Sequence, residues 1–209
     1  MKTIELFNGL HVKEVVMPSK RIIFNSDSKA DDLFFIGHGL VKIKDVSGKI
    51  VHCYTSGDFI GEEVIFGNNR YTHTAITQQK TKLYRLEEKL ISISSLQENG
   101  LYYHILDTIN ERRLEKEQML ESLVFKSVKD RIAIFISFIA KETGQEIGEN
   151  MYEILSFFTY SELADLTFTT RQTVTRIMQE FIKSSYCSKG SNHSFVVNKE
   201  FFKAFESVQ

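Results

Sequence analysis

The sequence predicts an α+β protein in which two domains are joined by a long helix. Three patterns predict it. They are short apolar runs separated by turn residues from Val12 to Leu86, an uninterrupted helical stretch from Ser95 to Phe125, and two closely spaced helix starts between Thr159 and Met178. With 209 residues, of which 42% are hydrophobic, the chain can fill two cores. We expect domain boundaries at 1–97 for a sheet domain, 98–126 for the helix and 127–209 for a helix-turn-helix domain.

The composition argues against several classes of protein. The net charge is −1, so a general basic coat for nucleic acid is not expected, and any DNA binding must be focused on one face. The apolar runs are too short to span a bilayer, which predicts a cytoplasmic protein without a membrane partner. Cys53 and Cys187 lie in different predicted domains, so a disulfide framework or a four-cysteine metal site is not expected. The sequence has no Walker loop, Gly-x-Ser-x-Gly or HExxH motif, so we expect no catalytic residues and no metal.

Short runs in the first half predict six strands, and so many strands in so few residues are typical of a roll or barrel. The runs are Arg21–Phe24, Leu33–Ile36, Leu40–Lys44, Ile50–Tyr54, Thr72–Ile76 and Lys82–Leu86. Glycine-containing triplets at 37–39, 47–49 and 56–58 lie where hairpin turns would be needed.

The stretch from Ser95 to Phe125 has no proline and, after Gly100, no glycine, which predicts a long helix. Its apolar side chains follow a spacing close to a heptad, at Tyr102, Ile105, Ile109, Met119 and Leu123. Such a seam predicts that the helix packs against a partner helix. The alternative is that the same stripe packs against the chain's own strands.

Two capping signals predict a pair of short helices in the second half. Thr159 precedes Glu162, and Thr169 precedes Gln172, each with the spacing of a capping box. The apolar stripes of the two helices would be Leu163 and Leu166, then Val174, Ile177 and Met178. After them, a turn at 189–192 between two short strands would form a wing, and Asn198 would cap a last helix.

The second of these helices has the polar side chains of a DNA-reading helix. Arginine can bracket guanine, glutamine can bracket adenine, and threonine can meet a phosphate or a thymine methyl. No acidic residue lies between Thr167 and Gln179, so phosphates would meet a positive face. The candidate DNA contacts are Thr159, Thr170, Arg171, Gln172, Thr173, Thr175, Arg176 and Lys189. The alternative is an ordinary helical hairpin with a wet polar face.

The segment Gly57–Arg70, which contains Gly61-Glu62, resembles the phosphate-binding cassette of cyclic-nucleotide-binding domains. Together with the helix-turn-helix it resembles the CRP/FNR family of bacterial transcription regulators over nearly the full length. The resemblance implies a cyclic-nucleotide-binding-like β-roll, a dimerisation helix and a winged helix-turn-helix domain, whose first helix would start near Asp130. It also implies a homodimer that binds a pseudo-palindromic operator in double-stranded DNA, works with RNA polymerase and is controlled by a small-molecule effector in the roll.

The cassette departs from the nucleotide-binding pattern. In the family, a Gly-Glu pair and an arginine hold the ribose and the cyclic phosphate. Here Tyr71 and Thr72 stand where nucleotide-binding members have Arg-Ser, and Arg70 comes one residue early. We therefore predict that cyclic AMP is not the effector, and expect an aromatic or small anionic metabolite beside Tyr71, Tyr54 and Phe66. The candidate effector residues are Gly61, Glu62, Glu63, Phe66, Arg70, Tyr71, Thr72, Lys116 and Glu117. The alternative is that Gly61 and Glu62 serve only the geometry of the roll.

Two further departures bear on function. Phe168 occupies a turn position where the family commonly has glycine. Either the turn is built differently, or the Phe168 ring fills the core between the two helices. The cysteine count argues against an iron–sulfur cluster of the FNR type, and haem at His38, His52 or His73 is a minor alternative, so we expect no cofactor. The competing function is a cyclic-nucleotide or haem sensor that acts through protein contacts, which would bind no operator.

Overall fold

The structure, a computed structural model, describes residues 7, 12–87, 100–148, 150–155, 158–190 and 194–206. The chain forms two compact units, Met1–Glu117 and Gln118–Gln209, and the division falls within the long helix α2 (Leu101–Phe125). The described residues include no helix that is both long and apolar enough to cross a bilayer.

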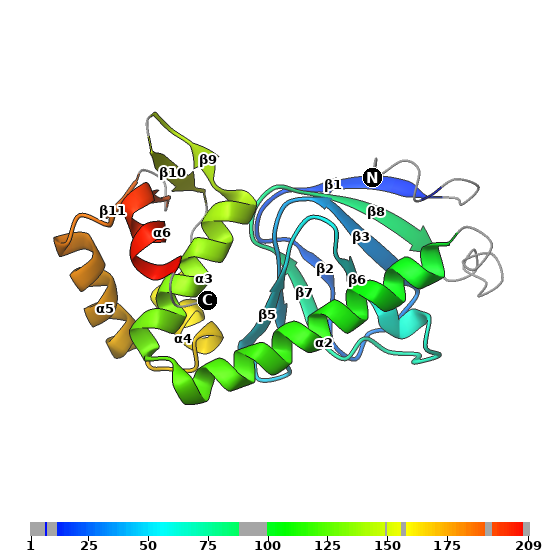
Figure 1. The fold of residues 1–209 in the computed structure, drawn as a ribbon. Helices are drawn as coiled ribbons and strands as arrows, with labels where there is room; N and C mark the ends of the chain where they lie inside the picture. The colour runs from blue at the N-terminus through cyan, green and yellow to red at the C-terminus, as the bar shows by residue number, and fades with distance from the viewer. Residues whose placement is uncertain are drawn as a thin grey trace. The chain divides into compact units, whose positions relative to one another are not determined.

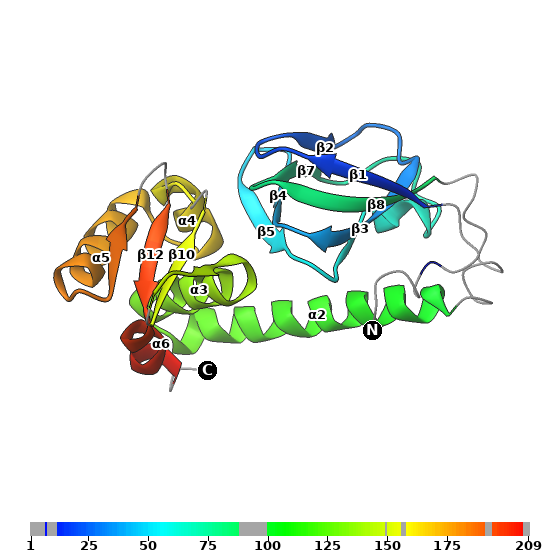
Figure 2. The same ribbon diagram turned by 90° about the horizontal axis from the view of Figure 1, so that it is seen from above.

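The N-terminal unit is a β-roll of two four-stranded antiparallel sheets, whose strands curve around a common interior (Figure 1, Figure 2). In the first sheet the order is β1 (Lys13–Met17), β8 (Thr81–Glu87), β3 (Asp32–His38) and β6 (Phe59–Ile60). In the second the order is β2 (Ile22–Phe24), β7 (Thr74–Thr77), β4 (Val41–Lys44) and β5 (Ile50–Tyr54). Strands β1 and β6 were not predicted, because β1 is largely exposed and β6 has only two residues.

Strand β3 lies between two cores. Phe34 and Ile36 belong to the cluster inside the roll, whereas Leu33 and Phe35 belong to a second cluster that includes residues of α2. Because successive side chains of a strand point to opposite faces, burial on both faces explains why this run is continuously apolar.

Only one of the three predicted hairpin turns is a hairpin. The turn at 47–49 joins the paired strands β4 and β5, and Asp45 Oδ1 accepts hydrogen bonds from the amides of Ser47 (2.9 Å) and Lys49 (3.0 Å). The triplets at 37–39 and 56–58 instead connect strands of different sheets, so the hairpin prediction was wrong there. A roll needs such crossings, which glycine permits as readily as it permits a hairpin.

The apolar seam predicted on α2 faces the chain's own roll in its first turns. Ile105 is buried in the cluster with Leu33 and Phe35, and Tyr102 and Ile109 pack against the same cluster. For these residues the alternative of packing within the chain is correct. A different face of the helix exposes large apolar side chains, at Tyr103, Leu106 and Leu114. The side chains of Met119 and Leu123, and the predicted helical residues before Gly100, lie outside the described residues.

In its described residues, the C-terminal unit combines the helices that follow α2 with a small antiparallel sheet. The elements are α3 (Val128–Thr143), β9 (Gln145–Glu146), β10 (Met151–Ile154), α4 (Tyr160–Leu166), α5 (Arg171–Lys183), β11 (Cys187–Lys189), β12 (Phe195–Asn198) and α6 (Lys199–Glu206). The sheet order is β11-β12-β10-β9. Ser127, not Asp130, is the N-cap of α3, and Asp130 completes its capping box. Asn198 caps α6 as predicted, since its Oδ1 accepts a hydrogen bond from the Phe201 amide at 2.9 Å.

Candidate DNA-contacting face and effector cassette

Helices α4 and α5 are joined by a short turn, and each begins at a threonine cap. Thr159 Oγ1 accepts from the Glu162 amide (3.2 Å) and Glu162 Oε2 accepts from the Thr159 amide (2.9 Å), which is the capping box predicted. At α5 the cap is Thr170, which accepts from the Thr173 amide at 3.2 Å. The predicted box of Thr169 with Gln172 is therefore wrong by one residue. The prediction failed because Thr169 still belongs to the turn, where its amide donates a hydrogen bond to Ala164 O.

Helix α5 has one buried and one exposed face. The buried side chains are Val174, Ile177, Met178 and Phe181. Arg171, Gln172 and Arg176 are exposed, Thr173 and Thr175 are half-buried, and Thr159 and Thr170 are exposed at the two caps. Because the stripe toward the core is fully apolar, the polar side chains gather on the opposite face.

The charges on this face come mainly from two arginines. Arg176 is 66% exposed, and its Nη1 lies 2.6 Å from Glu180 Oε1, one helical turn further on. Glu180 Oε2 also lies 3.4 Å from Lys129 Nζ of α3. The carboxylate therefore sits behind Arg176, toward α3. Lys189 is exposed at the end of β11, while residues 191–193 of the predicted wing lie outside the described residues.

The turn between α4 and α5 takes the conformation that favours glycine. Phe168 has φ 51° and is 55% exposed, so it does not plug the core between the helices. Glycine adopts this left-handed conformation without strain, whereas Phe168 holds it with local strain.

In the cassette, Gly61 is required by the fold. Its φ is 83°, and a Cβ there would lie 2.7 Å from the carbonyl oxygen of Asp32 and 3.1 Å from Tyr71 Cε1. Glu62 follows it at the start of a 3-10 helix (Glu62–Val64). The glycine therefore has a structural explanation that is independent of any ligand.

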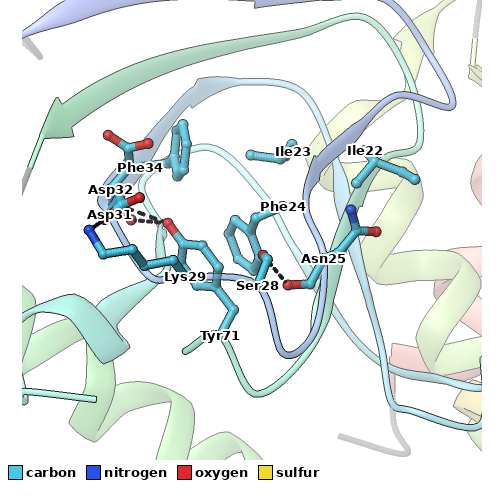
Figure 3. Close-up of a pocket in the computed structure, with 10 residues that line it drawn as sticks. All are labelled: Ile22, Ile23, Phe24, Asn25, Ser28, Lys29, Asp31, Asp32, Phe34 and Tyr71. Carbon is cyan, nitrogen blue, oxygen red and sulfur yellow. Dashed lines mark hydrogen bonds and ion pairs between the residues drawn. The ribbon is translucent and has the colours of Figure 1, made fainter. Parts of the chain in front are cut away.

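Tyr71 points into the roll (Figure 3). The residue is 4% exposed, and its ring stacks on Phe24 with 3.9 Å between the ring centroids. Its hydroxyl donates to Asp32 O (2.8 Å) and accepts from the Asp32 amide (3.0 Å). Burial raises the pKa of Tyr71 to about 12, so the phenol is neutral at physiological pH.

The other cassette candidates also have partners within the protein. Glu63 Oε1 accepts from both the amide (3.0 Å) and the hydroxyl (2.6 Å) of Thr72. Arg70 donates to the carbonyl oxygen of Asp27 and lies 3.6 Å from its carboxylate. Phe66 is exposed and is not part of the interior cluster. Tyr71 belongs to that cluster, and Tyr54 packs against it. The side chains of Lys116 and Glu117 lie outside the described residues.

A cavity of about 410 Å³ lies beside Tyr71. Its lining residues are Ile22, Ile23, Phe24, Asn25, Ser28, Lys29, Asp31, Asp32, Phe34 and Tyr71, with an ion pair between Lys29 and Asp31 (Figure 3). Sequence reasoning missed the part contributed by residues 22–32. Only the pairing of this loop with the cassette, through Tyr71 N to Ser28 O (3.0 Å) and Asp27 N to Tyr71 O (2.8 Å), brings the two together. Among the described residues, no group of three or more His, Cys, Asp or Glu could hold a metal ion.

The N-terminal unit matches a known domain family. Residues 14–92 match the family model of the cyclic nucleotide-binding domain, so the resemblance of the cassette is confirmed at the level of the domain. No curated protein matches the chain.

The whole chain then has the fold of CRP/FNR regulators. It is similar to the c-di-GMP-responsive global regulator CLP of Xanthomonas campestris, with 19% identity, a TM-score of 0.73 and coverage of 94% of this chain and 98% of CLP. A CRP-family transcriptional regulator from Thermus thermophilus gives 16% identity, a TM-score of 0.75 and coverage of 92% and 96%. A CRP/FNR-family regulator from the same bacterium gives 20%, 0.74, 93% and 98%. At identities this low, the matches establish a shared fold and no more.

Proposed function

We propose that the protein is a sequence-specific, homodimeric transcription regulator of the CRP/FNR type and not an enzyme. In this proposal α4 and α5 form the helix-turn-helix, β11 and β12 form the wing, and the domains are 1–97, 98–126 and 127–209. The observation that carries it is the exposed face of α5, where Arg171, Gln172 and Arg176 stand opposite a fully buried stripe.

This face suits the major groove of DNA. A recognition helix reads base edges with the side chains near its N-terminus, and bidentate contacts of arginine with guanine and of glutamine with adenine carry most of the discrimination. Arg171 and Gln172 occupy the first turn of α5, and Arg176 lies one turn later. The threonines at 159, 170, 173 and 175, and Lys189 on the wing, would contact phosphates.

The dimer interface would be the exposed apolar face of α2. Tyr103, Leu106 and Leu114 are large apolar side chains that the described part of the roll leaves exposed. A second copy of the helix packed on them would place two recognition helices on one side of the DNA. Half-sites on one face of the duplex are about 34 Å apart, so only one arrangement of the two helices fits.

The roll would control that arrangement through a small-molecule effector. The cavity beside Tyr71 is the candidate binding place. The effector is not cyclic AMP, because Tyr71 stands where nucleotide-binding members have the arginine that pairs with the phosphate. Arg70 is exposed and held by Asp27, and Lys29 of the cavity is paired with Asp31. RNA polymerase is the expected partner at the promoter. A sensor that acts only through protein contacts is not favoured, since it would leave the polar face of α5 without a role.

Selection of duplexes from a random pool by the full-length protein tests the proposal. We expect enrichment of a pseudo-palindrome whose two halves are separated by one helical turn. Footprinting on the selected duplex should show protection of both halves. If the protein retains duplexes without any common sequence, or retains none, then the proposed function is wrong.

A further inference from the structure

Arg131 of α3 links the end of α2 to the turn before α5. Its Nη1 donates to the carbonyl oxygen of Lys126 at 3.0 Å, and its Nε donates to that of Thr167 at 3.1 Å. A third approach, from Nη2 to Phe168 O, is 3.5 Å and therefore weak. Lys126 directly follows α2, whereas Thr167 and Phe168 form the turn, so one guanidinium holds two segments that are far apart in the sequence.

The Lys126 side of this link is fixed by the cap of α3. Asp130 Oδ2 accepts from the Ser127 amide (3.2 Å) and from its hydroxyl (2.6 Å). The chain therefore leaves α2 along a defined path. The guanidinium is planar and its donors have fixed directions. A shift of one carbonyl oxygen therefore displaces the guanidinium and, with it, the hydrogen bond to the other carbonyl oxygen.

The turn side of the link needs support. Phe168 has a bulky side chain at φ 51°, a conformation that crowds Cβ against the backbone. Thr167 Oγ1 donates to Leu163 O (2.6 Å), which ties the turn back to α4, and Arg131 ties it to α3. A strained backbone persists only where its surroundings hold it.

We propose that Arg131 is a positioning residue that transmits the orientation of the end of α2 to the recognition helix α5. It touches no base itself. Its role is to make the distance between the two recognition helices follow the packing of the two dimerisation helices. This inference rests on the proposed function, since it concerns how far apart the dimer holds its two DNA-reading helices.

The test measures tolerance to half-site spacing. The duplex selected by the wild-type protein is compared with duplexes that have one base pair more or fewer between the half-sites. Arg131→Lys keeps the charge but cannot span both carbonyls, so we expect the wild-type preference for the native spacing to shrink by about tenfold. The penalty for a changed base within a half-site should stay as in wild type, because the base contacts are intact. Lys141→Ala, an exposed position at the other end of α3, is the control.

A second variant separates positioning from stability. Phe168→Gly removes the strain of the turn, so Arg131→Lys with Phe168→Gly should recover the melting temperature lost by the single variant, but not the spacing preference. If the spacing preference survives in Arg131→Lys, or returns with Phe168→Gly, Arg131 only shapes the turn and the inference is overturned while the proposed function stands. If wild type selects no palindrome, both fail.

Discussion

The cassette of the roll and the exposed face of α5 treat their polar side chains in opposite ways. In the cassette, Tyr71 is hydrogen-bonded to Asp32 inside the roll, and Glu63 accepts two hydrogen bonds from Thr72. On α5, Arg171 and Gln172 extend into solvent from a helix whose other face is completely buried. The cassette uses its polar groups within the fold, whereas α5 exposes them to solvent.

This difference means that the Gly-Glu motif by itself does not predict nucleotide binding. Gly61 matches the cyclic-nucleotide pattern, yet its left-handed backbone and its close approach to Asp32 require glycine whether or not a ligand binds. The family match over residues 14–92 therefore describes how the roll is built. The chemistry of α5 has no such structural requirement, because exposed positions of a helix accept many residue types.

The largest effect is expected on α2, which also has one face packed within the fold and one face exposed. Leu106→Glu places a charge on the outward face, next to its own copy in the proposed dimer, so we expect monomers. Loss of the second half-site should weaken operator binding by about a hundredfold or more. Sedimentation and anisotropy titration measure the two effects.

The matched variant is Ile105→Glu, one residue earlier on the inward face. Ile105 is buried against the roll, so this change should unfold the N-terminal unit instead of merely separating the copies. A folded monomer from Ile105→Glu, or a dimer from Leu106→Glu, would reverse the assignment of the two faces.

Gly61→Ala tests whether the cassette glycine is structural. The new Cβ meets Asp32 O at 2.7 Å in a left-handed conformation, so we expect a loss of about 2 to 4 kcal/mol in the free energy of unfolding. Gly67→Ala is the control, because Gly67 also has a positive φ (75°) but no atom within 4 Å of its Cβ position, and it should cost only about 1 kcal/mol. Equal losses in urea titrations would show that the close approach does not matter.

Arg176→Ala tests whether the outward face of α5 reads bases. We expect a loss of about 1 to 3 kcal/mol on the selected duplex and much less on random DNA at the same salt concentration. Lys141→Ala, an exposed position on α3, should change little. Equal losses on the two duplexes for Arg176→Ala would make this residue a phosphate contact.

Much of the fold could be predicted from the sequence because local signals and burial agree. The strand periods, the box of Thr159 with Glu162 and the apolar stripes of α4 and α5 each reflect interactions within a few residues. The turns at 37–39 and 56–58 were misread because glycine marks a bend without saying which sheet the next strand joins.

The sites were less predictable because they depend on long-range pairing. The stripe Tyr102, Ile105 and Ile109 has the spacing of a dimer seam, and only the tertiary structure shows that the roll covers it. Likewise, Arg131 carried no signal of its role, since its partners at 167 and 168 lie more than thirty residues away.

The smallest expected effect is that of cyclic AMP on the wild-type protein. We expect no heat in calorimetry and no change in operator binding, because the groups that would hold the phosphate have other partners. The Tyr71 hydroxyl donates to Asp32 O, and the phenol, which its pKa of about 12 keeps neutral, offers a phosphate no positive charge. The Thr72 amide and hydroxyl donate to Glu63, whose carboxylate would repel a phosphate.

Replacement of these groups should reverse the result. Tyr71→Arg supplies a guanidinium, and Glu63→Gln removes the competing charge, so the double variant should bind cyclic AMP more tightly than either single variant, by about one to two orders of magnitude. Tyr71→Phe is the control, because it keeps the ring but adds no charge. Micromolar binding of cyclic AMP by the wild-type protein, coupled to tighter operator binding, would mean that Arg70 leaves Asp27 and reaches the phosphate, and the contrast between cassette and α5 would fail.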